Sequence, residues 1–295
     1  MSQVLPILFI FLSGYIFKKF HRDSSKDLID LVLYFIFPIF IIYKIHYLEF
    51  NEDIYIVASF ALLAFILGVI FAILSAKIFN INKNSTAMIA MAVAYGNTSF
   101  LGFAFVESYY GEYALSLAIF YDQVNMLLLA TLSPIICAIG TNKGNISTKK
   151  ILHSIITFPP TIAFIIAIIS KFIILPEVLS LFLEKVSYTL VPLVIFAVGM
   201  KFKLSSIKGK EKEISIVTII SMFLIPLSLY FISLPFFSID IAIKVSIIEA
   251  AMPPMVLATV IAIKSGLDEE LGMGSMGVGM ILSFITIPLF VLFMN

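Results

Sequence analysis

Apolar stretches about as long as a bilayer is thick recur along this sequence, and they constrain its fold more than any other feature. A helix needs about 20 apolar residues to cross the hydrocarbon core of a bilayer. Ten stretches fit this description, and they cover approximately residues 3–20, 28–45, 54–79, 85–106, 112–139, 151–173, 178–200, 214–236, 241–263 and 271–293. The sequence therefore predicts an all-α, polytopic membrane protein with ten transmembrane helices.

Composition supports lipid as the solvent for this chain. Hydrophobic residues make up 61% of the sequence and charged residues only 13%, whereas soluble domains carry about 25% charged residues. The net charge of +1 gives no reason to expect a nucleic-acid partner. The single cysteine, Cys137, cannot form a disulfide within the chain, and the three histidines are scattered, so we expect neither a metal site nor a cofactor.

The positions of the basic residues predict the orientation of the chain. Fifteen of the 19 Lys and Arg residues lie in connectors that follow odd-numbered stretches. The other four are Lys44, Lys171, Lys185 and Lys244. Short loops rich in Lys and Arg remain in the cytoplasm. We therefore expect a multi-pass protein of the cell membrane, with both termini on the non-cytoplasmic side.

Weak similarity between the two halves indicates an internal repeat. Pro38 in the second stretch corresponds to Pro192 in the seventh, 154 positions later, and Gly111 corresponds to Gly266, 155 positions later. Such a nearly constant offset is typical of a duplicated segment.

The repeat predicts two units of five helices each, residues 1–140 and 141–295. Because five is an odd number, the second unit enters the bilayer in the opposite direction. The predicted architecture is thus a 5+5 inverted repeat, a plan common among secondary transporters, which bind their substrate near the bilayer midplane where helices are interrupted.

Helix-breaking residues interrupt the fourth and ninth stretches at equivalent positions of the repeat. Glycine is a weak helix former, Asn, Thr and Ser compete for backbone hydrogen bonds, and proline removes a donor and clashes with the preceding turn. A break leaves one half-helix with free N–H groups and a positive dipole end, which favour an anion such as a carboxylate. The residues predicted to bind substrate at the two breaks are Gly96, Asn97, Thr98, Ser99, Met252, Pro253 and Pro254.

Polar side chains within the apolar stretches extend this candidate site. Asp122, Gln123 and Asn125 lie in the middle of the fifth stretch, and Glu249 precedes Pro253 by four residues. A carboxylate at the bilayer centre costs about 2.5–3.5 kcal/mol on insertion scales, so it should face the protein interior. Two interpretations remain open: these side chains contact substrate or titrate during transport (Asp122 and Glu249), or they form interhelical hydrogen bonds and cap a half-helix.

The break motifs resemble those of a known family. Residues 96–102 read Gly-Asn-Thr-Ser-Phe-Leu-Gly, which is similar to the Gly-Asn-Thr-Gly-Phe-Leu-Gly signature of the auxin efflux carrier family, and residues 250–256 resemble the C-terminal half of that family. This sequence departs from the pattern at Ser99, where the family often has Gly, and at Pro254, where a small residue is common.

The resemblance implies a ten-helix carrier related in fold to the bile acid:sodium symporters. It implies a scaffold formed by helices 1, 2, 6 and 7, a transport domain formed by helices 3–5 and 8–10, and a substrate site where the broken helices 4 and 9 cross. It also implies a homodimer by analogy, and dicarboxylate substrates for bacterial members.

Two functions follow from the sequence. The first is a secondary transporter of a small organic anion that works by alternating access, with possible coupling to H⁺ or Na⁺. The second is a cation/proton exchanger of similar crossed-helix fold that uses Asp122 and Glu249. An intramembrane enzyme is disfavoured because no hydrolytic group of residues is recognisable in the apolar stretches.

Overall fold

The computed structural model describes residues 4–21, 24–48, 51–141, 159–201, 209–235 and 239–294, and these residues form helices joined by short connectors. The first half contains α1 (Val4–Phe20), α2 (Ser25–Leu31), η1 (Val32–Ile36), α3 (Phe37–Tyr47), α4 (Glu52–Phe79), α5 (Lys83–Ala94), η2 (Thr98–Gly102) and α6 (Phe103–Thr141). The second contains α8 (Pro159–Ser170), α9 (Glu177–Ser187), α10 (Leu190–Lys201), α11 (Glu211–Ile219), η4 (Ile220–Leu224), α12 (Ile225–Ser233), α13 (Ile241–Ala250), α14 (Val256–Lys264) and α15 (Glu269–Met294). The η segments are single π-helical turns that continue into their neighbours. The prediction of an all-α fold is confirmed for the residues that the structure describes.

Six continuous helical runs in these residues are long and apolar enough to cross a membrane. They are 27–47, 52–79, 98–141, 177–197, 211–233 and 269–294. Four other expected spans are not among these runs. The fourth and ninth are divided by their breaks, α1 has 17 residues, and the described part of the sixth begins at Pro159 of α8. The ten-helix inverted repeat therefore stays a prediction.

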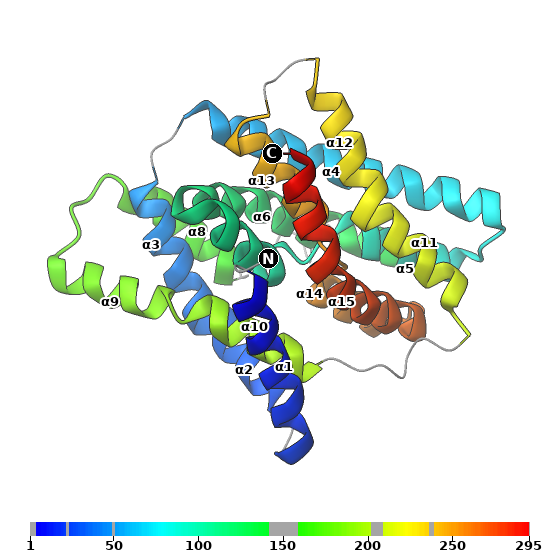
Figure 1. Cartoon of the computed structure of the whole chain (residues 1–295), viewed down its shortest axis with the longest axis horizontal. Helices are drawn as coiled ribbons and strands as arrows, with labels where there is room; N and C mark the ends of the chain where they lie inside the picture. Colours follow the sequence, from blue (N-terminus) through cyan, green and yellow to red (C-terminus); the bar gives the residue numbers. More distant parts are fainter. Residues whose placement is uncertain are drawn as a thin grey trace.

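The helices pack in two groups, which Figure 1 shows on different sides of the molecule. In one group α1 packs along α10, α10 contacts α2, and α3 packs against α8 and α9. In the other, α4, α5, α6 and α13 pack together, and α11 and α14 contact α15. The first group contains the helices expected to form the scaffold. The division into scaffold and transport domains has no direct test in this arrangement and stays a prediction.

Two glycines allow α1 and α10 to approach closely. A Cβ atom on Gly14 would overlap the backbone carbonyl oxygen of Phe196, and a Cβ on Gly199 would overlap that of Phe11. Small residues at a membrane helix interface let the backbones come together where larger side chains would hold them apart. The reciprocal contacts fix the position of α1 against α10.

The helix α6 is bent where it begins its second part. Gly111 has φ 79° and ψ −168°, and an added Cβ would meet nothing within 4 Å. The positive φ, rather than a lack of space, is therefore what favours glycine here. The bend separates the helical run that starts at the first break from the one that carries Asp122, Gln123 and Asn125.

Large apolar side chains also cover the outside of the molecule. Ile78 and Leu292 are 70% and 73% exposed. The charge pattern of the connectors can be followed only in part, because the basic residues Arg22, Lys143, Lys149, Lys150, Lys203 and Lys208 lie outside the described residues. The predicted orientation of the chain therefore has no structural test.

A polar junction at Asp268 ties together the beginnings of three helices. Asp268 Oδ2 accepts hydrogen bonds from Lys210 Nζ at 2.6 Å and from Ser85 Oγ at 2.8 Å. Its Oδ1 accepts from the Leu271 backbone N–H at 3.2 Å and so caps α15. Partial burial alone would raise the pKa of Asp268, but these three donors together lower it below the usual value, and the carboxylate in turn raises the pKa of Lys210.

The lowered pKa of Asp268 predicts an acid-dependent loss of stability. Because the folded state favours the ionised carboxyl group, its contribution is present above the unfolded pKa of about 3.9 and is lost as the pH falls through the lower folded pKa. Replacing Asp268 by Asn should cost about 1 kcal/mol at pH 7 and flatten the decline in melting temperature below pH 4. Melting curves between pH 3 and 8 measure both effects.

The exposed Glu270, two residues further along, provides a matched control. We expect Glu270→Gln to change the melting curve much less than Asp268→Asn, because Glu270 acts on Lys210 only electrostatically and makes none of the hydrogen bonds of the junction. Equal effects of the two substitutions would show that Asp268 has no special role in joining the helices.

Candidate functional site

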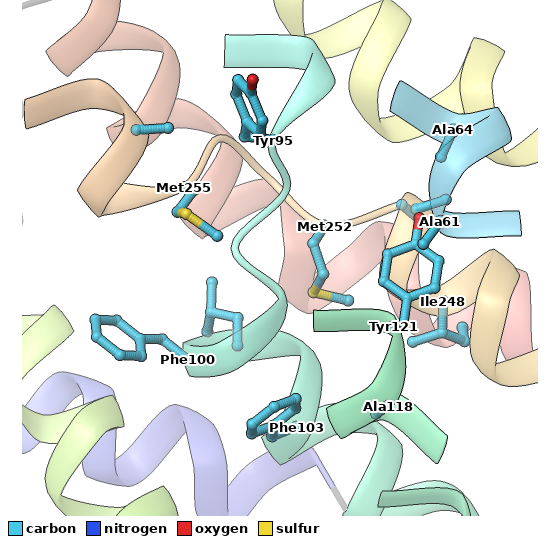
Figure 2. Close-up of a cluster of buried hydrophobic side chains, with 14 of the residues drawn as sticks. Ala61, Ala64, Tyr95, Phe100, Phe103, Ala118, Tyr121, Ile248, Met252 and Met255 are labelled. Carbon is cyan, nitrogen blue, oxygen red and sulfur yellow. The ribbon is translucent and has the colours of Figure 1, made fainter. Parts of the chain in front are cut away.

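The two predicted breaks interrupt their helices and lie side by side. The first is the extended segment between α5, which ends at Ala94, and η2, which begins at Thr98; the second lies between the end of α13 at Ala250 and the start of α14 at Val256. Figure 2 shows the segment from Tyr95 to Phe100 beside the one from Met252 to Met255.

Backbone hydrogen bonds join the two breaks directly. The Asn97 N–H donates to Pro253 O at 2.7 Å, and the Met255 N–H donates to Tyr95 O at 2.9 Å, so that Gly96 and Pro254 form an antiparallel bridge. Each break thus satisfies backbone groups that the other leaves free, which a nonpolar environment requires. The predicted residues Gly96, Asn97, Pro253 and Pro254 are therefore in mutual contact.

Close contacts hold other elements against the paired breaks. A Cβ on Gly102 would overlap Glu249 Oε2, so this glycine gives the Glu249 carboxyl group its space. A Cβ on Gly279 of α15 would lie 2.7 Å from Pro253 Cβ. Met252 is fully buried, and its backbone lies over Gly96. Both breaks are consequently enclosed by protein, as the expected depth of the site demands.

Asp122 lies at the N-terminus of the half-helix that follows the first break. Its Oδ1 accepts hydrogen bonds from Thr98 Oγ1 and Ser99 Oγ, both at 2.5 Å, and the Ser99 backbone N–H faces the same carboxylate. A negative group is favoured at this position by the free N–H groups and by the helix dipole. The anion expected at this half-helix is thus a side chain of the protein.

Asn125 connects the same helix to the break. Its Nδ2 donates to Gly96 O and to Thr98 Oγ1, each at 3.3 Å. Asp122 and Asn125 therefore share the face of α6 that meets the first break, as their spacing predicts. Gln123 lies on a different face, and its Nε2 has no hydrogen-bond partner among the described residues. The structure does not bring Gln123 to the breaks.

Several polar atoms at the breaks are buried without a hydrogen-bond partner in the described part of the chain. They are Asn97 Nδ2, Asp122 Oδ2, and both Glu249 carboxyl oxygens. Their residues are at most 1% exposed. The Asp122 and Glu249 carboxyl groups are close enough to interact electrostatically. Unpartnered buried polar groups are costly and therefore point to a ligand, a proton or an ion that completes them.

A small polar cavity lies beside these groups. Its volume is about 10 Å³, which is close to the smallest space that holds one water molecule. Tyr121 and Asn125 of α6 line it together with Gly96 and Glu249. Tyr121 could not be singled out from the sequence, because an aromatic residue in an apolar helix is ordinary; its place beside Glu249 depends on how the helices pack.

The described residues contain no group of three or more His, Cys, Asp or Glu side chains that could hold a metal ion. Asp122 and Glu249 are the acidic groups buried at the breaks, and Cys137 is buried elsewhere in α6. His153 falls outside the residues that the structure describes.

The similarity of this chain to known proteins extends over nearly its whole length. A family model described as "membrane transport protein" matches residues 1–291. The chain belongs to this family of membrane transporters. The match spans both halves of the chain and both breaks, and it confirms the resemblance seen in the break motifs. Together with the apolar helices, it identifies a multi-pass membrane protein.

Two archaeal relatives carry similar descriptions. An uncharacterized transporter of Methanothermobacter thermautotrophicus is 25% identical over 294 residues, which are 98% of this chain and 96% of the relative. An uncharacterized transporter of Methanocaldococcus jannaschii is 26% identical over 220 residues, or 70% of each chain. Their similarity to this chain supports transport as its class of activity. Their descriptions name no substrate, so the substrate must be inferred from the site.

The contact between Gly102 and Glu249 yields a test of the site's packing. Gly102→Ala should lower the melting temperature, because overpacking a buried position costs about 1–3 kcal/mol. In a Glu249→Ala background the carboxyl group is gone and the added methyl group has room, so the same substitution should cost much less. Melting temperatures of the four variants of this cycle, measured on purified protein, give the coupling. An equal cost in both backgrounds would contradict the contact.

Proposed function

We propose that this membrane transporter is a secondary carrier of a small organic anion, a carboxylate, which binds at the paired breaks and crosses the membrane by alternating access. The observation that carries the proposal is the Asn97 side chain. Asn97 is 1% exposed, and its Nδ2 has no acceptor among the described residues. A carboxylate oxygen is the kind of acceptor that a buried amide donor needs.

The second half-helix offers further donors for the same group. The helix α14 begins at Val256, and Met255, which precedes it, provides no side-chain cap. The first N–H groups of a helix have no intrahelical partner, and they favour negative charge. At η2 the corresponding position holds Asp122. The two half-helices therefore differ, because the Asp122 carboxylate occupies the N-terminus of η2. We place the substrate carboxylate at the N-terminus of α14.

The charge of the site requires that a cation accompany the anion. Asp122 and Glu249 are both buried, and the polar side chains gathered at the breaks in the described residues include no Lys or Arg. Two carboxylates and an anionic substrate in a low-dielectric site would repel one another strongly. We infer that protons or Na⁺ ions enter with the substrate at Asp122 and Glu249, which makes the carrier a symporter.

Movement of the site follows from how the breaks are joined. Because backbone hydrogen bonds connect the two breaks, they would move as one unit. This unit comprises α4–α6 and α11–α15, and it would move relative to the scaffold group of α1–α3 and α8–α10. We place the protein in the cell membrane with both termini on the non-cytoplasmic side, and we propose a homodimer, as the family resemblance implies.

A cation/proton exchanger is the second candidate. The observation in its favour is Glu249, whose carboxyl oxygens both lack partners beside the small polar cavity. In an exchanger Asp122 and Glu249 would alternate between a proton and a metal cation, and Asn97 would only support the break. The two functions therefore differ in the importance of Asn97 for binding an anion.

Reconstituted protein tests the proposal. In proteoliposomes, uptake of radiolabelled propionate or succinate should require a proton or sodium gradient. Asn97→Ala should raise the apparent KM about tenfold or more, because a hydrogen bond to a charged group is lost. Asn84→Ala serves as the control, because it removes a half-buried amide at the start of α5 that donates to Gly266 O and takes no part in the contacts between the breaks.

The outcome separates the two candidates. Uptake that depends on Asn97, and that loses its coupling in Asp122→Asn or Glu249→Gln, supports the carrier. Proton flux driven by a sodium or potassium gradient, without carboxylate uptake and without an effect of Asn97→Ala, supports the exchanger and contradicts the carrier.

A further inference from the structure

A second charged feature lies away from the breaks, at the end of α3. Lys44 is 5% exposed, and its Nζ makes no hydrogen bond with any described residue. Its nearest opposite charge is Glu112 Oε2, at 3.6 Å. An ammonium group has three donors and is strongly hydrated in water, so a buried ammonium without hydrogen bonds is costly. The Lys44 ammonium group can therefore still donate hydrogen bonds to an acceptor.

A cavity of about 330 Å³ opens at this lysine. This volume is within the range of pockets that bind small molecules. Its polar and aromatic lining residues are Tyr43, Lys44, Tyr47, Glu112, Tyr113 and Ser116. The hydroxyls of Tyr47 and Tyr113 are already engaged, with Ser180 and with Asn51 and Asp53, respectively. Lys44 is thus the group in this lining that can attract a negative ligand.

Glu112 occupies the position that a ligand carboxylate would take. It follows Gly111 at the bend of α6, and its side chain is 64% exposed. Besides Lys44, it contacts Tyr188, whose hydroxyl donates to Oε1 at 3.3 Å. The Lys44 ammonium is buried, whereas the Glu112 carboxylate is largely exposed and can return to water. Loss of Glu112 alone would leave a buried charge unpaired, but a ligand carboxylate that takes its place keeps the ammonium paired, so the exchange costs little.

We propose that this cavity is an anion-capture site in which the carboxylate of a small solute replaces Glu112 on Lys44. The inference rests on the proposed function, because it makes the cavity a first binding site for the carried anion. The exchange also opens the contact between α3, from the scaffold group, and α6, which belongs to the group of the breaks. Capture of a ligand thus loosens a link between the two groups.

The surrounding charges define the class of ligand. Glu107 and Glu112 both lie near Lys44, and Glu184 lies near Tyr43 and Tyr188. A second negative charge on the ligand would meet these carboxylates without a further cation from the lining. The site therefore favours a monoanionic carboxylate over a dianion, and the tyrosine rings provide an apolar surface for its body.

Opposite effects of two substitutions test this site. Equilibrium binding of radiolabelled propionate is measured on the purified full-length chain, with succinate and alanine as competitors. Lys44→Met should weaken propionate binding about tenfold or more, because a charged hydrogen-bond donor is lost. Glu112→Gln should strengthen binding severalfold by removing the competing carboxylate. Lys185→Met, at an exposed lysine of α9, should change nothing.

Further variants keep the test decisive. Lys44→Arg retains the charge and should bind propionate within about threefold of the unaltered protein. In the Asn97→Ala background the site at the breaks is weakened, and the remaining binding should still depend on Lys44. Succinate should compete less well than propionate.

The results distinguish this inference from the proposed function. Carboxylate uptake by proteoliposomes that is insensitive to Lys44→Met and Glu112→Gln overturns the capture site and leaves the carrier intact. Propionate binding that depends on Lys44, in a protein that transports no carboxylate, contradicts the proposed carrier function. It still supports an anion-binding site at Lys44. A loss of binding in both Lys44→Met and Glu112→Gln would show an ion pair that only supports the structure, and would overturn the exchange.

Discussion

The backbone hydrogen bonds between the two breaks are the interaction on which the rest of this structure depends. Two unwound segments inside a membrane protein expose N–H and C=O groups that lipid cannot satisfy. Here the bonds from Asn97 to Pro253 and from Met255 to Tyr95 satisfy part of this requirement, and they hold four half-helices together at one point. The Asn97 side-chain amide beside these bonds has no acceptor among the described residues, and the proposed function places the substrate there.

The paired breaks also explain why buried carboxyl groups gather around them. Asp122 stabilises the start of one half-helix through Thr98 and Ser99, and Glu249 fits into the space that Gly102 leaves. Neither group has a basic partner at the breaks among the described residues. Under the proposed function, charge that enters this site is balanced by protons or ions, whereas the cavity at the end of α3 offers the ammonium group of Lys44. The two proposals together make the cavity and the breaks successive binding places for one anion.

Several of the long helices and the location of the two breaks could be predicted from the sequence alone. Apolar length predicted 54–79 and 271–293, and the structure has helices at Glu52–Phe79 and Glu269–Met294. Gly96 and the adjacent prolines Pro253 and Pro254 weaken helices whatever surrounds them, so the interruptions could be predicted locally.

Contacts between distant residues could not be predicted in this way. Nothing in the local pattern indicates that Glu249 meets Gly102, or that Lys44 meets Glu112, because both contacts depend on how helices rotate and pack. The sequence analysis expected the first half-helix to favour an anion, but it did not identify that anion as Asp122. Periodicity placed Asp122 on an inward face, and only the packed structure places its carboxylate against Thr98 and Ser99.

Cross-linking of the two breaks tests the central claim most directly. Gly96 and Pro254 are partners in an antiparallel bridge that is flanked by hydrogen bonds, and such partners have Cα atoms about 4.5 Å apart, within reach of a disulfide. In a Cys137→Ser background, the pair Gly96→Cys and Pro254→Cys should form an intramolecular disulfide under mild oxidation, and reduction should reverse it. Folded protein in which both thiols remain free under oxidation, as they do in each single-cysteine variant, would contradict the pairing.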